Sequence, residues 1–224
     1  SSGRRHARVS RIGWARRGVK GTAFQGSNEY DEGYGVAVEE ISSIYVTGSS
    51  VAAWGTPINP YSGGSDIVVL KLDSSGTRLW HTFYGSKDWD LGYGIAVDKD
   101  GNVYVSGFSY AAWGTPIAPY RGNDDIVVLK LDSSGVYQWH TFHGSTNDDI
   151  GLGIAVDKEG NIYVTGSSDA TWGSPITPYS GGSDMVVLKL NNSGVYPVSY
   201  THLRAHETVL DLVCRLLLEK KKHT

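Results

Sequence analysis

Four short stretches with the hydrophobic pattern of β-strands recur in a fixed order along most of this chain. In the central part of the sequence these stretches are GIAVD (94–98), NVYVSG (102–107), DIVVLKLD (125–132) and VYQWHTF (136–142). Some of them alternate apolar and polar residues, and the others are rich in β-branched residues. Turn residues at 99–101 and 133–135 separate them in pairs. Since no helical periodicity occurs between Gly33 and Tyr196, the pattern predicts an all-β fold.

The four-strand unit occurs three times, with a period of 59 residues. We place the repeats at 33–91, 92–150 and 151–196, inside a repeat region of 21–196. Equivalent positions keep the same spacing: Trp54/Trp113/Trp172, Tyr45/Tyr104/Tyr163 and Asp66/Asp125/Asp184. Four antiparallel strands joined by tight turns form a propeller blade, whereas the coils of a β-solenoid are usually shorter and parallel. The repeats therefore predict a β-propeller fragment of about three four-stranded blades.

Three blades are too few to close a propeller, which typically has about four to eight. We therefore expect an open arc that exposes apolar blade faces at both ends, with the rest of the propeller in the parent chain. We also expect poor solubility or self-association when the chain is made alone.

Several motifs resemble those of a known repeat family. The sequences GYGIAVDKDGNVYVSGFS, DIVVLKLDSSG and WHTFHGS resemble the bacterial and archaeal seven-bladed β-propeller repeat called SBBP, in a long form with an AWGTPI-type insertion. The resemblance covers about 21–196 and implies a secreted or surface-exposed propeller without an agreed enzymatic activity. In the first copy, residues 39–42 replace the usual Asp-x-x-Gly turn, so we expect a looser turn there.

The segments on either side of the repeats do not follow the pattern. Residues 1–20 lack the expected IVVLKL stretch, which leaves open a divergent first repeat and a mistranslated segment. After Tyr196 the expected Gln-Trp-His-Thr-Phe is replaced by an unrelated sequence, and the tail 197–224 resembles a translated sequencing adapter. We therefore expect this tail to be non-native and exclude it from functional reasoning, although its pattern alone predicts a capped helix over 208–222.

Charge is distributed unevenly along the chain. The net charge is −3 overall, but residues 21–196 contain eight basic and twenty acidic side chains, which gives them a net charge of −12. So acidic a region repels a polyanion, which excludes nucleic-acid binding. No apolar run approaches the roughly 18 residues that a membrane-spanning helix needs, so we expect no membrane span.

Aspartates recur at two positions of every repeat. One position precedes the first strand and has acidic neighbours in two copies: Asp31, Asp90 and Asp149, with Asp88 and Asp148. Carboxylates there can bind a cation or act as acid and base, or they can accept backbone N–H groups in the turn between blades. Recurrence favours the turn, because catalysis needs one site whereas every blade needs a turn. The second set opens the third strand, where we expect a capping or turn role: Asp66, Asp125 and Asp184.

Three other patterns lead to no catalytic prediction. The run 98–102 resembles the start of a calcium loop but lacks the distal bidentate Glu, so we interpret it as a hairpin turn, with weak calcium binding as the alternative. His81 and His140 recur without a nucleophile-elbow context. The run 92–94 enters a strand and lacks the third glycine of a nucleotide fingerprint. We expect no catalytic residue, no metal and no cofactor.

The connection between the second and third strands, 110–124 in the central copy, is longer than a hairpin needs. Its recurring aromatic residues are our candidate ligand-binding residues: Trp54, Trp113, Trp172, Tyr61, Tyr120 and Tyr179. Aromatic rings that prolines hold on a blade edge can stack on sugars or anchor a protein partner. Alternatively, they pin a long loop onto its own blade. Trp80 and Trp139 lie within a strand and are expected in the core between blades.

Taken together, these patterns predict a non-catalytic recognition or adhesion protein that binds an extracellular protein or carbohydrate. An extracellular or cell-surface location is implied by the family resemblance. The alternative is a secreted propeller enzyme that acts on polysaccharide. That activity requires a pair of carboxylates in one funnel that departs from the repeat consensus.

Overall fold

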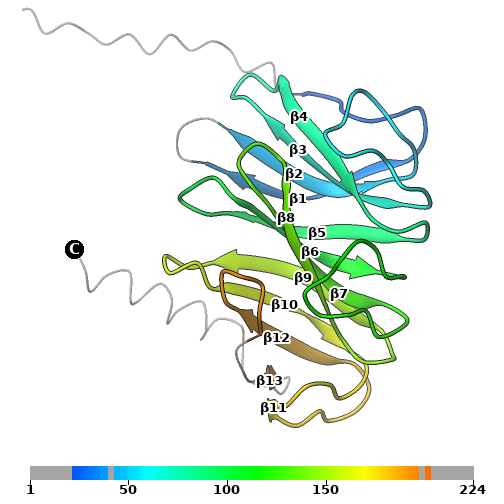
Figure 1. The fold of residues 1–224 in the computed structure, drawn as a ribbon, viewed down its shortest axis with the longest axis vertical. Helices are drawn as coiled ribbons and strands as arrows, with labels where there is room; N and C mark the ends of the chain where they lie inside the picture. The colour runs from blue at the N-terminus through cyan, green and yellow to red at the C-terminus, as the bar shows by residue number, and fades with distance from the viewer. Residues whose placement is uncertain (1–21, 40–42, 197–199, 203–224) are drawn as a thin grey trace, which may run out of the picture.

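The chain folds into three β-sheets that are stacked in chain order (Figure 1). This computed structural model describes residues 22–39, 43–196 and 200–202, and all regular secondary structure in these ranges is β-strand. The predicted all-β fold is confirmed. The same ranges contain no helix with the length and apolar character needed to cross a bilayer.

Two four-stranded antiparallel sheets form the first and second blades, in the orders β1-β2-β3-β4 and β5-β6-β7-β8. The strands of the first blade are β1 (Asp31–Val38), β2 (Ile44–Ser50), β3 (Asp66–Leu72) and β4 (Arg78–Tyr84). Those of the second are β5 (Asp90–Val97), β6 (Val103–Ser109), β7 (Asp125–Leu131) and β8 (Tyr137–His143). The four predicted strands are all present. The first one is longer than the apolar run suggests, because it begins at the recurring Asp itself.

The third blade keeps three of the strands and completes its sheet differently. It contains β9 (Asp149–Val156), β10 (Ile162–Ser168), β11 (Pro175–Thr177), β12 (Asp184–Leu190) and β13 (Tyr200–His202), in the order β11-β13-β12-β10-β9. Strand β13 pairs with β12 where β4 and β8 pair in the other blades, with Val186 opposite His202. In the first blade Val68 faces Phe83, which corresponds to position 201. The backbone register of the fourth strand is therefore shifted by one residue relative to the repeat.

A β-bulge interrupts the pairing of the first two strands in every blade. In the second blade the register shifts between Gly92 and Gly94. Gly107 lies opposite this bulge, and a Cβ there would be 1.7 Å from the Leu91 carbonyl oxygen. Only glycine permits so close a backbone approach, which explains the recurring glycine of this strand.

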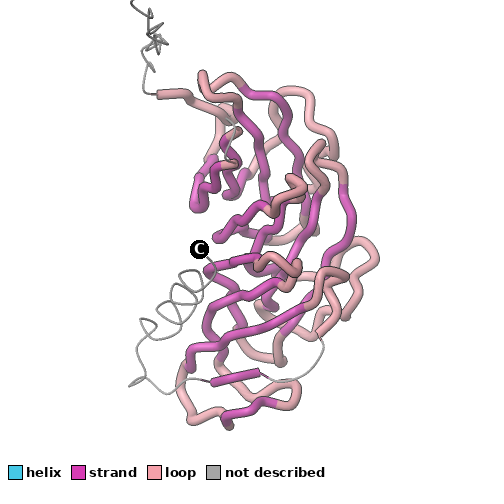
Figure 2. Tube along the Cα trace, turned by 90° about the vertical axis from the view of Figure 1, so that its left-hand side faces the viewer, coloured by secondary structure: helices cyan, strands magenta, loops and turns pink. Residues whose placement is uncertain are grey.

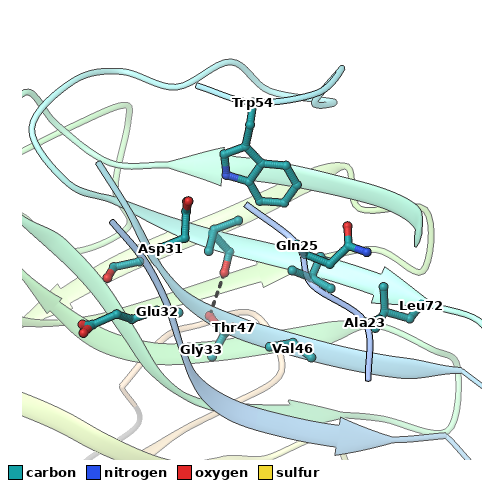
Figure 3. Close-up of a pocket in the computed structure, with 13 residues that line it drawn as sticks. Ala23, Gln25, Asp31, Glu32, Gly33, Val46, Thr47, Trp54 and Leu72 are labelled. Carbon is teal, nitrogen blue, oxygen red and sulfur yellow. Dashed lines mark hydrogen bonds between the residues drawn. The ribbon is translucent and has the colours of Figure 1, made fainter. Parts of the chain in front are cut away.

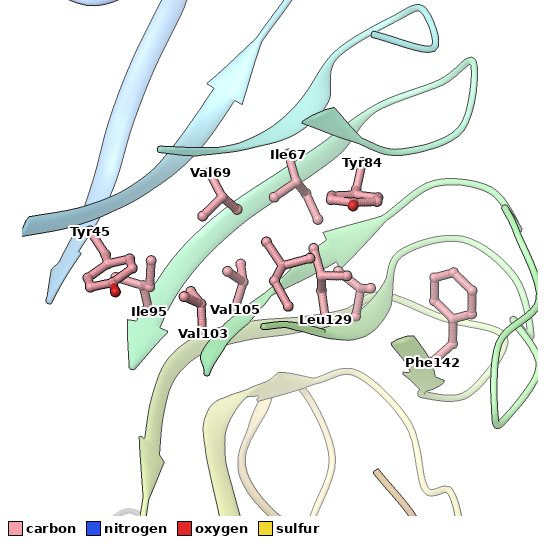
Figure 4. Packing of buried hydrophobic residues seen from close by; sticks show 11 residues of the cluster. Tyr45, Ile67, Val69, Tyr84, Ile95, Val103, Val105, Leu129 and Phe142 are labelled. Carbon is pink, nitrogen blue, oxygen red and sulfur yellow. The ribbon is translucent and has the colours of Figure 1, made fainter. Parts of the chain in front are cut away.

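Neighbouring blades pack through two apolar cores, which we call the first and second junctions. The core of the first junction joins strands of the first two blades (Figure 4), and its buried residues include Tyr45, Ile67, Val69, Ile95, Val103 and Val105. The core of the second junction includes Tyr104, Ile126, Val128, Ile162, Val164 and Leu188. Trp80 packs against the first core and Trp139 against the second, as the sequence predicts.

No described blade covers the two outer faces of the stack. Val36 in β1 is 67% exposed, whereas Ile95, at the same repeat position in β5, is 8% exposed. A shallow cleft of about 180 Å³ opens on this face of the first blade, with Asp31, Val46 and Trp54 among its walls (Figure 3). At the other end Met185 is 38% exposed, whereas its equivalent Ile126 is fully buried. Figure 2 shows the three blades as an open arc, as expected.

Some sequence predictions lie outside the described residues. They are the origin of residues 1–20, the looser turn at 40–42 and most of the predicted adapter-derived tail, namely 197–199 and 203–224. The origin of the tail stays a prediction, and only the three residues of β13 in it have a described backbone.

Candidate functional site

In the first two blades the long loop is anchored by a tryptophan stacked on a histidine. The ring centroids of Trp54 and His81 are 4.1 Å apart, and those of Trp113 and His140 are 3.8 Å apart, with the planes within 9° of parallel. The histidine also binds the loop backbone, since His140 Nε2 lies 2.9 Å from the Trp113 carbonyl oxygen. Further along, the Ile117 N–H donates to the His140 carbonyl oxygen at 2.9 Å. The loop is thus fixed against the last strand of its own blade.

His140 is neutral, and its hydrogen bonds give it a structural role. A carbonyl oxygen can only accept, so Nε2 carries the proton, and Nδ1 accepts the Tyr137 hydroxyl at 2.8 Å. Burial lowers the pKa of His140 to about 4. Both ring nitrogens are occupied, which suits a packing role better than proton transfer.

The recurring aspartate at the start of each blade is connected to the same loop. In the third blade, Asp149 Oδ2 accepts the Ser145 N–H at 2.6 Å, and Asp149 Oδ1 accepts the Ser168 hydroxyl. That hydroxyl oxygen in turn accepts Trp172 Nε1–H at 2.8 Å. Asp90 accepts the Ser86 N–H in the same way. The predicted turn role is confirmed, and in the first and third blades the aspartate orients the tryptophan through a serine.

The aspartates that open the third strand have the predicted turn role as well. Asp66 Oδ2 accepts the Ser62 N–H at 2.6 Å, and Asp125 Oδ2 accepts the Arg121 N–H at the same distance. Both carboxyl groups are fully buried, and burial together with a carboxylate of the next blade raises the pKa of each to about 7. These neighbours are Asp90 for Asp66 and Asp149 for Asp125. Each junction therefore buries a pair of acidic groups.

The predicted hairpin turn at 98–102 is confirmed. Asp98 Oδ1 accepts the N–H groups of Asp100 and Asn102, both at 2.9 Å. Burial opposes ionisation of Asp98, but its hydrogen bonds, above all the one from the Asn102 side-chain amide, lower its pKa. In the described part of the chain, no three His, Cys, Asp or Glu side chains converge on a point that could hold a metal ion.

The six candidate ligand-binding residues are all placed in the loops of their own blades. Trp54 and Trp172 are buried, and Trp113 is half-buried. The tyrosine hydroxyls close the loop, since Tyr61 Oη lies 2.8 Å from the Val51 carbonyl oxygen and 2.7 Å from that of Gly64. Tyr120 and Tyr179 make the equivalent contacts. This geometry is the one expected if the rings pin the loop, and their contact with a ligand stays a prediction.

The structure adds an element that sequence reasoning missed, namely a cleft between neighbouring blades beside each loop. The first junction cleft has a volume of about 540 Å³ and is lined by Asn59, Tyr84, Gly85, Trp113, Gly114, Thr115, Tyr137, Gln138, Trp139 and His140. The second junction cleft, of about 280 Å³, is formed largely by equivalent positions, with His143, Trp172 and Tyr196 in place of Tyr84, Trp113 and Tyr137. Trp113 is thus the one candidate residue that contributes to the larger cleft.

A signal for this cleft was present in the sequence. Position 84 is Tyr in the first copy and His in the second, and position 137 is Tyr where the first copy has Arg78. Positions at which nearly identical copies differ are candidates for a function that is specific to one copy, because the shared fold does not require those residues. The candidate residues predicted from the sequence are those shared by all copies, so these differing positions were missed.

The comparisons with known proteins agree with this architecture. Residues 80–111 and 138–171 match the SBBP family, described as a beta-propeller repeat. Within these two ranges the chain carries SBBP beta-propeller repeats. Each match runs from the last strand of one blade into the first two strands of the next, so the SBBP unit spans a junction.

Two curated proteins resemble part of the chain. One is the regulatory protein FlaEY of Caulobacter vibrioides, 35% identical over 148 residues, which covers 62% of this chain and 16% of that protein. The other is an uncharacterized WD repeat-containing protein of Acanthamoeba polyphaga mimivirus, 26% identical over 163 residues, which covers 63% of this chain and 11% of that protein. The match thus spans less than a fifth of each relative.

Proposed function

We propose that this chain is part of a secreted or cell-surface β-propeller protein of a bacterium or archaeon, and that it recognises an extracellular protein or carbohydrate without catalysing a reaction. The observation that carries the proposal is the repetition of one anchored loop beside each junction. Identical elements at regular spacing suit binding through many weak contacts, whereas catalysis needs one distinct site. The names of the two relatives, a regulatory protein and a WD repeat-containing protein, support a binding role.

The experiment alters the same exposed loop position in every blade. Thr56, Thr115 and Ser174 are equivalent and exposed, so replacing all three by Glu leaves the cores intact. Binding of the labelled full chain to bacterial cells and to insoluble polysaccharides is then measured. We expect the triple variant to bind on the order of a hundredfold more weakly, and each single variant far less so, because avidity multiplies small losses.

A matched control changes exposed turn residues at another repeated position, Ser74→Glu, Ser133→Glu and Asn192→Glu, and should bind like the unaltered chain. Equal binding by a folded triple loop variant would refute recognition through the loops.

A second candidate function, hydrolysis of polysaccharide, is favoured by one pair of carboxylates. Asp124 and Asp148 both depart from the repeat. At the position of Asp124 the other copies have Ser65 and Ser183, and at the position of Asp148 they have Tyr30 and Trp89. Burial and the nearby Asp148 and Asp149 carboxylates raise the pKa of Asp124 to about 6, which suits a general acid. Release of reducing sugar that is lost in Asp124→Asn would support this activity over recognition alone. No release from a panel of polysaccharides would dismiss it.

A further inference from the structure

We propose that the first junction cleft binds a neutral saccharide. The proposal rests on the recognition function proposed above and names its ligand class and its site. Each of the two clefts forms only where neighbouring blades meet, and the two clefts differ in their lining residues.

The walls of the first junction cleft are aromatic and are held in place from behind. Trp113 stacks on the buried His140 on one side, and its ring centroid is 6.3 Å from that of Tyr84, with the planes 28° apart. The ring centroids of Tyr84 and Tyr137 are 5.9 Å apart. Trp113 and Tyr137 are only half-buried, so part of each side chain is accessible. Rings that are already fixed lose little entropy when a sugar face stacks on them.

Polar side chains that suit hydroxyl groups lie on the same walls. Thr115 and Gln138 are exposed, and Asn59 is half-buried. Amide and hydroxyl groups both donate and accept hydrogen bonds, as sugar hydroxyls do. The Asn59 amide is oriented by its Nδ2, which donates to the Phe83 carbonyl oxygen at 2.7 Å. The cleft therefore combines stacking surfaces with groups that can bind a polyol.

The charge of the cleft restricts the ligand. None of its ten lining residues carries a charge, because the one titratable base, His140, is neutral. The repeat region as a whole has a net charge of −12, which repels acidic polysaccharides. An uncharged ligand fits both facts. A proline-rich peptide also binds aromatic grooves, but the amide and hydroxyl groups of this cleft favour a sugar.

The second junction cleft provides an internal comparison. It has Ala118 where the first has Asn59 and His143 where the first has Tyr84, and the charged Arg121 lines it. Its volume is about half as large. The same fold therefore forms one neutral aromatic cleft and one smaller cleft that contains the positively charged Arg121. We expect the first cleft alone to bind the saccharide.

The test is calorimetric titration of the full chain with neutral β-1,4-linked hexasaccharides of glucose and of xylose. An acidic oligogalacturonate and a proline-rich decapeptide serve as competing ligand classes. The double variant Thr115→Ala, Gln138→Ala removes two exposed hydrogen-bonding groups without touching a core. We expect it to bind the neutral hexasaccharide on the order of tenfold more weakly. Ser174→Ala, at the position of Thr115 in the third blade, should leave the affinity unchanged.

The outcomes separate this proposal from the function on which it rests. Cell-surface binding without any affinity for the neutral hexasaccharides overturns the proposal and leaves recognition standing. Binding of the decapeptide or the oligogalacturonate in their place, or an unchanged affinity in the folded double variant, overturns it as well. No binding to cells, polysaccharides or oligosaccharides overturns both.

Discussion

The second blade and the two blades beside it have almost the same sequence but very different surroundings. In the second blade both faces are covered, and strands β6 and β7 are buried along nearly their whole length. In the first blade more than half of the residues of β1 are exposed, and in the third blade β12 alternates between buried and half-buried positions, with Met185 exposed. The burial of β1 and β12 thus depends on a neighbouring blade, whereas β3, which the first junction covers, is buried as fully as β7. The same residue is core in one copy and surface in another, which allows the contribution of a junction to be measured by equivalent substitutions.

The largest expected contrast is at one phenylalanine position. Phe142 is 1% exposed and packs against Trp113 and His140, whereas Phe24, two repeats earlier, is 93% exposed. Phe142→Ala should cost about 3–5 kcal/mol of unfolding free energy in urea denaturation. Phe24→Ala should change it by less than about 0.5 kcal/mol. Similar losses would mean that Phe24 is covered in solution.

A second contrast isolates the packing between blades. Ile126 is fully buried in the second junction, and Met185 is its equivalent on the open face of the third blade. Ile126→Ala should destabilise the chain by about 2–5 kcal/mol, and Met185→Ala by about 1 kcal/mol or less. If Met185→Ala costs as much as Ile126→Ala in the same denaturation measurement, the outer face is not open.

The two open faces should also bring separate copies together. Val36 on one face and Met185 on the other occupy positions that the junctions bury, so a second copy can dock there. Light scattering coupled to size exclusion should show a mass that rises with concentration, and Met185→Glu should reduce that rise. A monodisperse, cooperatively folding monomer at all concentrations would contradict this account.

The last contrast is one of pH dependence and concerns the acidic pairs at the junctions. Because the pKa of Asp66 is raised to about 7 in the folded chain, from about 4 when unfolded, its stabilising contribution is complete below about pH 4 and is lost as the pH rises through 7. Asp66→Asn removes this dependence. In thermal denaturation, the stability of the Asp66→Asn variant relative to the unaltered chain should therefore increase between pH 5 and pH 8. Asp125→Asn, at the other junction, should behave alike, and a change of opposite sign would contradict the buried pair.

Much of the fold could be predicted from the sequence because three copies average out chance patterns. The alternation in 102–107 and the β-branched run in 125–132 are local signals, and the strands β6 and β7 follow them closely. The bulge between Gly92 and Gly94 arises from backbone pairing, so no apolar pattern in the sequence indicates it. For this reason the start of β5 at Asp90, before its apolar run, was not predicted. The end of the third sheet also escaped prediction, since β13 has no repeat pattern at all.

The candidate site was predicted only in part, for a related reason. Recurrence identified Trp113 and the loop that carries it, but the loop pattern does not reveal the histidine on which the ring stacks. The cleft beside it joins Tyr84 of one blade to Tyr137 of the next, and a contact between repeats cannot be derived from a single repeat. The residues that distinguish the two clefts, such as Asn59 and Ala118, lie at positions where the copies differ.

Hydrogen exchange, followed by mass spectrometry blade by blade, tests the central claim most directly. At a concentration where the chain is monomeric, amides of β6 and β7 should exchange slowest, because two junctions cover them. The equivalent amides of β10 and β12, which a single junction covers, should exchange faster. Equal protection of the three blades would contradict the claim that the junctions, and not the sequence of each blade, set the stability of the array.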